Sequence, residues 1–275
     1  MTYIKKKITR TLCLGILVVA GLGLMTSRVQ AGAGIDVLRN MSDELCTASA
    51  DCTSPGDYTY PARVFSYSFD PYGSGSEAFF YANHPAIVAP EEEEELGEGF
   101  QLLPALTDIS FNLKAFNLPN ATTTNLAFWD GSGEVEFELV PTGTALSVYK
   151  VVGPTTLSAT VDGLGNDVNG FVISKTCEEG GLHEHPNYSL VGDGFAPAQG
   201  IYLWSMELSM TGMQTTKPFF VVMETDQSPV AALDAATAWV DSNVDSLTTV
   251  PEPSSWLLLG SAVLGLAWFR RKSRA

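Results

Sequence analysis

The segment "IYLWSMELSM" (residues 201–210) decides the fold class of this chain. Its large apolar side chains recur at every second position, at Tyr202, Trp204, Met206, Leu208 and Met210. Because successive side chains of a β-strand point to opposite faces of a sheet, this period of two predicts a strand with one face in a core. We therefore expect Trp204 to be a core residue.

Two further segments, "DISFNLKAF" (108–116) and "EVEFELV" (134–140), alternate in the same way. Turn sequences lie between such segments: "DGSG" (130–133), "DGLGND" (162–167) and "APAQG" (196–200). Short strands at regular spacing are typical of a sandwich of two sheets. The predicted fold is mainly β: an antiparallel β-sandwich over residues 61–227, Ig-like or jelly-roll-like.

Residues 228–247, "SPVAALDAATAWVDSNVDSL", depart from this pattern. Their apolar positions recur at helical intervals after a Ser-Pro start, so we expect one amphipathic helix packed on the sandwich. Residues 32–60 are rich in Ser, Asp and Thr, and we expect an irregular segment there. Cys46 and Cys52 are close enough in sequence to form a disulfide in an oxidising compartment, which leaves Cys177 without a partner.

The first 31 residues have the three parts of a secretory signal peptide. A basic stretch precedes the apolar run from Thr11 to Met25, and small residues precede a cleavage position after Ala31. The apolar run is shorter than the ~20 residues that span a bilayer. We therefore expect cleavage and export rather than a permanent anchor.

The last residues, 248–275, combine the triplet Pro251, Glu252 and Pro253 with an apolar run from Trp256 to Phe269 and a basic end. This arrangement resembles the PEP-CTERM sorting signal of Gram-negative bacteria. The resemblance implies processing by an exosortase, a transient anchor in the inner membrane through a short transmembrane segment, and delivery to the cell surface or exopolysaccharide matrix. An ordinary tail anchor is the alternative.

The exported part is strongly acidic. Of the 15 basic residues, five lie in the signal and four in the tail, whereas 30 of the 31 acidic residues remain, so the net charge of the rest is −24. Nucleic acid requires a basic surface, and a nucleic-acid partner is therefore excluded. A surface of this charge also raises the local concentration of cations.

The segment "GLHEHPNYSL" (181–190) holds two of the three histidines. On a strand, His183 and His185 would share a face, and a pair of imidazoles is a common half of a zinc or copper site. The candidate further donors are His84, Cys177, Glu178, Glu179 and Glu184. Glu184 ranks last because it would point to the opposite face. Alternatively, the histidines only form hydrogen bonds on a surface strand.

The surroundings of this pair resemble a known group of surface proteins. The stretches "GLHEHPNYSLVGDGFAPAQGIYLWSMEL", "LAFWDGSGEVEFELVP" and "PFFVVMETD" are similar to surface-anchored proteins that accompany zinc and manganese transporters, most of all the Zur-repressed branch with a PEP-CTERM tail. The resemblance implies zinc handling at the cell surface under metal limitation, with His183 and His185 as the motif's histidines. The small number of other histidines argues against a high-capacity metal store.

Three functions can be compared at this point. The first is a non-catalytic surface protein that binds zinc. The second is an adhesive protein of the polysaccharide matrix, with Trp129, Tyr188 or Trp204 as the contacting aromatics. The third, a hydrolase, is disfavoured because the sequence lacks the Gly-x-Ser-x-Gly and His-Glu-x-x-His motifs of common hydrolases. We therefore expect that the protein is not an enzyme.

Overall fold

The structure is a computed structural model that describes residues 34–50, 58–225 and 230–248. The predicted signal peptide, the predicted transmembrane segment, the Pro-Glu-Pro triplet and Cys52 lie outside the described residues. Within them, no helix is both long and apolar enough to cross a membrane.

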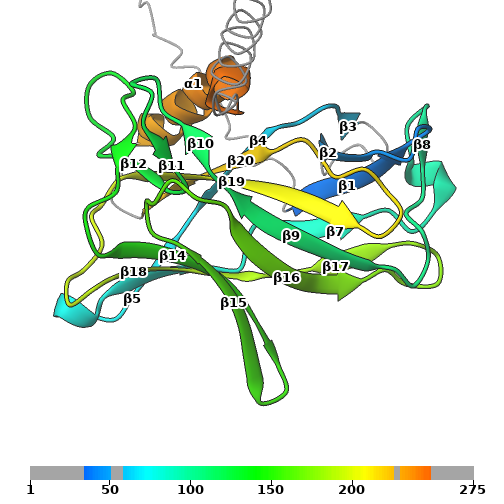
Figure 1. The fold of residues 1–275 in the computed structure, drawn as a ribbon, viewed down its shortest axis with the longest axis horizontal. Coiled ribbons are helices and arrows are strands. Elements are labelled where there is room, and N and C mark those ends of the chain that lie inside the picture. Colours follow the sequence, from blue (N-terminus) through cyan, green and yellow to red (C-terminus); the bar gives the residue numbers. More distant parts are fainter. Residues whose placement is uncertain (1–33, 51–57, 226–229, 249–275) are drawn as a thin grey trace, which may run out of the picture.

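The described residues form twenty strands, two short 3-10 helices and one α-helix (Figure 1). They are β1 (Gly34–Asn40), β2 (Leu45–Ala50), β3 (Tyr58–Thr59), β4 (Val64–Ser68), β5 (Asp70–Tyr72), η1 (Gly75–Glu77), β6 (Phe79–Ala82), β7 (Ala86–Ala89), η2 (Glu93–Glu95), β8 (Phe100–Gln101), β9 (Asp108–Lys114), β10 (Phe116–Asn117), β11 (Thr123–Thr124), β12 (Ala127–Trp129), β13 (Glu138–Leu139), β14 (Thr144–Val152), β15 (Thr155–Val161), β16 (Val168–Lys175), β17 (Leu182–Glu184), β18 (Asn187–Gly192), β19 (Ile201–Met210), β20 (Phe219–Glu224) and α1 (Val230–Thr248).

Strand β19 is the centre of the largest sheet, and its bounds match the predicted strand. It pairs with β20 over Ile201–Met206, and its other edge pairs first with β12 and then with β9. The sheet continues through β13 beyond β12, through β16 beyond β9, and through β4 beyond β20. The predicted apolar face is buried: Trp204 packs against Tyr188 of β18, with ring centroids 6.0 Å apart.

The opposite face of the same sheet is also apolar, because α1 covers it. Ile201 and Leu203 of β19 form a second core with Leu233, Ala236 and Val240 of the helix. Figure 1 shows the resulting layers, with α1 above this sheet and the sheet of β14, β18 and β5 below it. The mainly β fold with one helix near its C-terminal end is therefore confirmed, and the layers are arranged as in a sandwich.

Two larger sheets and the two-stranded sheet β10-β11 complete the described body. A five-stranded sheet has the order β15-β14-β18-β6-β5, and a six-stranded sheet has the order β17-β7-β1-β2-β3, with β8 also paired to β1. The sheets are not purely antiparallel as predicted, since β1 pairs with β7 and β20 pairs with β4 in parallel. Residues far apart in the sequence meet through these pairs.

The prediction of an irregular segment at 32–60 was wrong for residues 34–50. Residues 34–50 form the paired strands β1 and β2, in which Ile35, Val37 and Leu45 are buried. The polar residues that suggested a loop are accommodated inside the fold: the Thr47 hydroxyl donates to the carbonyl of Ala62 at 2.6 Å. Composition indicated a loop, but the apolar residues on either side of Asp36, Ile35 and Val37, determine that this segment is a strand.

The predicted strand at 134–140 was also largely wrong, because only Glu138–Leu139 is a strand. Phe137 is buried against Trp239 of the helix, with ring centroids 5.5 Å apart, whereas Leu139 is 51% exposed. The segment therefore anchors α1 through one ring instead of contributing an apolar strand face.

Arg63 links the C-terminal end of α1 to the sheet through hydrogen bonds. Its side chain is 13% exposed and donates from Nε and Nη2 to the Pro218 carbonyl at 3.0 and 2.9 Å, and from Nη1 to Asp245 at 2.8 Å. A further contact of 3.4 Å joins Nη2 to the hydroxyl of Thr248. One guanidinium thus links the loop before β20 to the last turn of the helix.

We predict that Arg63→Ala lowers the free energy of unfolding by about 2 kcal/mol, because the half-buried Pro218 carbonyl loses two charge-assisted hydrogen bonds. Urea unfolding followed by tryptophan fluorescence measures this change. Asp245→Ala is the matched control, since the Asp245 side chain is 92% exposed and a solvent-screened ion pair contributes no more than about 0.5 kcal/mol. An equal loss of unfolding free energy in both variants would contradict the assignment of the stabilisation to the hydrogen bonds between Arg63 and the Pro218 carbonyl.

Candidate functional site

The three histidines meet where the chain twice crosses from one sheet to another. Residues 83–85 connect β6 of the five-stranded sheet to β7 of the six-stranded sheet, and residues 185–186 connect β17 to β18 in the reverse direction. The strands on either side are paired antiparallel, Tyr188 with Ala82 and Glu184 with Ile87. The two crossings therefore lie side by side.

The histidine rings are in contact at this junction. His183 Nε2 lies 3.0 Å from His185 Nε2, and the two rings stack with centroids 4.9 Å apart. The ring of His84 meets that of His185 edge to face at 5.1 Å. His183 is exposed, whereas His84 and His185 are half-buried. The sequence pattern placed His183 and His185 on one face, and here their nitrogens are neighbours.

A backbone carbonyl fixes the tautomer of His185. Its Nδ1 lies 2.9 Å from the carbonyl oxygen of Asn83, which can only accept, so Nδ1 carries the hydrogen. In the neutral ring Nε2 then presents its lone pair toward His183. A histidine whose second nitrogen donates to a carbonyl in this way has the orientation found in metal-ligating histidines.

The nitrogen pair has nearly the spacing of two zinc ligands. Two nitrogens each about 2.0–2.1 Å from a tetrahedral zinc ion are separated by about 3.3 Å, a few tenths of an ångström more than the observed distance. Across the described ranges, however, no group of three or more His, Cys, Asp or Glu side chains is arranged to hold a metal ion. The site therefore supplies two converging nitrogens, the Nε2 atoms of His183 and His185, and the ring of His84 lies beside them.

Two of the other predicted donors are engaged elsewhere. Glu184 points away from His183, as expected from the strand period, and accepts from Lys150 Nζ at 2.7 Å. The sulfur of Cys177 accepts the N–H of Gly181 at 3.2 Å, within its own turn. Of the four residues predicted as metal ligands, the three histidines are therefore in mutual contact, and Cys177 is not part of that cluster.

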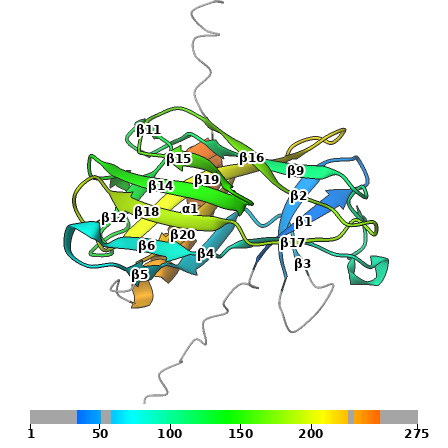
Figure 2. The same ribbon diagram turned by 90° about the horizontal axis from the view of Figure 1, so that it is seen from below.

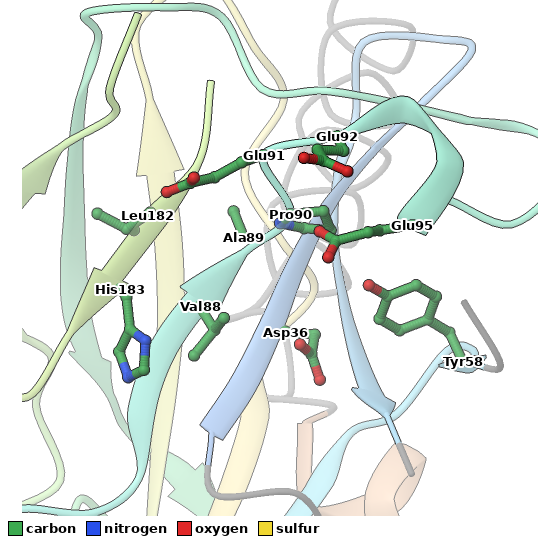
Figure 3. A pocket seen from close by; sticks show the side chains of 10 residues that line it. All are labelled: Asp36, Tyr58, Val88, Ala89, Pro90, Glu91, Glu92, Glu95, Leu182 and His183. Atoms are coloured by element: carbon green, nitrogen blue, oxygen red, sulfur yellow. The ribbon is translucent and has the colours of Figure 1, made fainter. Parts of the chain in front are cut away.

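An acidic groove of about 340 Å³ begins at His183 (Figure 3). The strand register places His183, Val88 and Asp36 in one row across β17, β7 and β1. The side chains of Asp36, Tyr58, Glu91, Glu92 and Glu95 also line the groove. The run of five glutamates at 91–95 is exposed, and its last three residues form η2.

The negative charge of this groove affects the pKa of Tyr58, which lines it. Burial raises the pKa of Tyr58 to about 12, and the negative charges of Asp36 and Glu95 add to the effect. The same field favours cations next to His183. Sequence reasoning missed Asp36 and Tyr58, because they reach the groove only through the strand pairing of the segment predicted to be irregular.

The aromatics proposed for contact with a matrix are buried. Trp129 is 5% exposed, and Tyr188 and Trp204 are fully covered. The prediction that these rings contact a polysaccharide was therefore wrong for Trp129 and Tyr188, whereas the expectation that Trp204 is a core residue is confirmed. Tyr188 instead helps to hold the crossing segment, since its hydroxyl donates to the Pro85 carbonyl at 3.1 Å.

The predicted disulfide involves one described cysteine. Cys46 is buried, and its sulfur lies 3.2 Å from the hydroxyl of Tyr60. Its predicted partner Cys52 is outside the described residues, so the bridge stays a prediction. Desolvation by burial raises the pKa of the Cys46 thiol, although the contact with Tyr60 partly opposes this.

A family comparison places a known motif at the end of the chain. Residues 249–272 match the PEP-CTERM protein-sorting motif, in agreement with the triplet at 251–253. This motif supports export of the protein, sorting to the cell surface and processing by an exosortase. No curated protein shows a significant match to the chain.

We predict that the folded protein protects Cys46 from alkylation. Because its raised pKa lowers the thiolate fraction and burial blocks access, iodoacetamide at pH 8 should label it at least about tenfold more slowly than in urea. Mass spectrometry of the labelled peptides measures the rate. A parallel sample treated with reductant reports the bridge, since bridged Cys46 would be labelled in urea only after reduction. Equal rates in the folded and unfolded protein would contradict the burial.

Proposed function

We propose that this exported surface protein binds zinc, or a similar borderline divalent metal, through His183 and His185, and that it does so without catalysis. The 3.0 Å approach of the two Nε2 atoms is the observation that carries the proposal. Without an ion, one ring must donate a hydrogen to the other. With an ion, both lone pairs can serve as ligands.

The remaining ligands would come from His84 and from water. The edge of His84 contacts His185, and the exposed face of His183 leaves room for solvent. A site with two fixed nitrogens and an open side suits an ion that is taken up and released, because each additional protein ligand would strengthen retention. The similarity of residues 181–208 to the Zur-repressed surface proteins supports zinc as the metal.

The acidic groove supports the same proposal through charge. Its carboxylates at 36, 91, 92 and 95 lie on the approach to His183. They would raise the local concentration of divalent ions without fixing one ion in place. In this arrangement the groove collects cations, and the imidazole pair selects zinc over the harder calcium and magnesium ions.

The test is isothermal titration of the full chain, purified in detergent, with zinc. The double variant His183→Ala/His185→Ala should lose at least about 100-fold in affinity, because both fixed ligands are removed. His84→Ala should lose about tenfold if this ring completes the site.

Glu184→Gln is the matched control, since this neighbour points to the opposite face and pairs with Lys150. Its zinc affinity should stay within about twofold of the parent, which is the size expected of a remote change in charge. Equal stoichiometry and affinity in the parent and the double histidine variant would overturn the site. Zinc binding that survives there but falls in a Glu91→Gln/Glu95→Gln variant would place the ion in the groove instead.

A further inference from the structure

The outer face of the five-stranded sheet carries mostly uncharged side chains, aromatic and hydroxyl ones among them, with Asp70 as its one charged residue among the described strands. Its inner residues, such as Val148 and Leu190, are buried in the core, so the residues between them point outward. Figure 2, seen from below, looks onto these strands. Among the described residues of β5, β6, β14, β15 and β18, only Asp70 and Lys150 are charged, and Lys150 points inward to Glu184.

The strand register aligns the outward residues in rows. One row crosses all five strands: Thr160, Ser147, Ser189, Tyr81 and Asp70. With neighbouring strands about 4.8 Å apart, this row is roughly 19 Å long. A second row holds Ser158, Tyr149 and Asn187. The face is thus long enough for an extended chain of several small rings.

Aromatic rings stand at one end of this face. Tyr72 is 47% exposed and stacks on Phe79 at 5.6 Å, and the same ring meets Tyr81 edge to face at 5.5 Å. Tyr149 is half-buried, two strands away from Tyr81. An exposed tyrosine offers a flat apolar surface with a polar edge, at a low cost in side-chain entropy.

Hydrogen bonds between the polar groups of this face hold them in place. The Tyr81 hydroxyl donates to Asn187 Oδ1 at 2.6 Å, and the Asn187 amide in turn contacts the Tyr149 carbonyl at 3.4 Å. Ser147 and Thr160 share a hydrogen bond of 2.8 Å. Fixed donors and acceptors beside aromatic rings lower the entropy that a ligand must overcome on binding.

We propose that this face binds an uncharged polysaccharide. Sugar rings have apolar C–H faces that stack on tyrosine and hydroxyl edges that bond to serine, threonine and asparagine, and the face presents both groups in register. An anionic polymer would meet the repulsion of a chain whose exported part has a charge of −24. Among the described residues of these strands it would find no outward-pointing basic side chain to offset that repulsion, since Lys150 points inward to Glu184. The proposal does not depend on metal binding at the histidines.

The experiment measures retention of the full chain, in detergent, on beads carrying dextran, galactomannan or hydroxyethyl cellulose, with alginate beads as the anionic comparison. We expect retention on at least one neutral polymer and none on alginate. Tyr72→Ala and Tyr149→Ala should each lower the affinity for that polymer by roughly threefold to tenfold, the loss expected for one aromatic contact.

Leu164→Ala is the matched control, because Leu164 is 59% exposed but lies in the loop after β15 and belongs to neither row. Its retention should equal that of the parent, and the urea midpoints of all variants should agree. Retention should also persist in EDTA and in the double histidine variant, which separates this proposal from the metal site. A lack of retention on every neutral polymer, or unchanged retention in a Tyr72→Ala/Tyr149→Ala variant, would overturn the proposal.

Discussion

Burial of both faces of β19 is the constraint on which the rest of the structure depends. Its Trp204 face closes the core against β18, and its Leu203 face is closed only because α1 packs across it. A strand with water on one side would tolerate polar residues there, but Ile201 and Leu203 would be exposed without the helix. The sheet, the helix and the segment around Phe137 that contacts the helix therefore form one cooperative unit.

The histidine cluster is a consequence of how two sheets are joined. The β6–β7 and β17–β18 connections cross the same boundary in opposite directions, and strand pairing on both sides keeps them adjacent. Tyr188 fixes one crossing to the other through the Pro85 carbonyl. The imidazoles are thus positioned by paired backbone on either side, which is how a small site gains geometric definition in a β protein.

The part of this arrangement that follows from local pattern was predictable. The period of two located β19 and separated His183 from Glu184, and the helical period located α1. The contact of His84 with His185 depends on strand order, and sequence spacing alone carries no information about that order. Composition misled at 34–50, where burial of Ile35 and Val37 outweighs their polar neighbours. The same limit applies to the tyrosine rows, whose members come from separate strands.

The attachment of α1 by Arg63 also has a consequence for maturation. Thr248, the last described residue, contacts this guanidinium, and Pro251 follows only three residues later in the chain. Three residues span at most about 11 Å, even fully extended. A membrane protease that reads the triplet on the folded protein would therefore act within about one helix diameter of α1. Trimming of the folded protein would therefore bring the protease close to the domain itself.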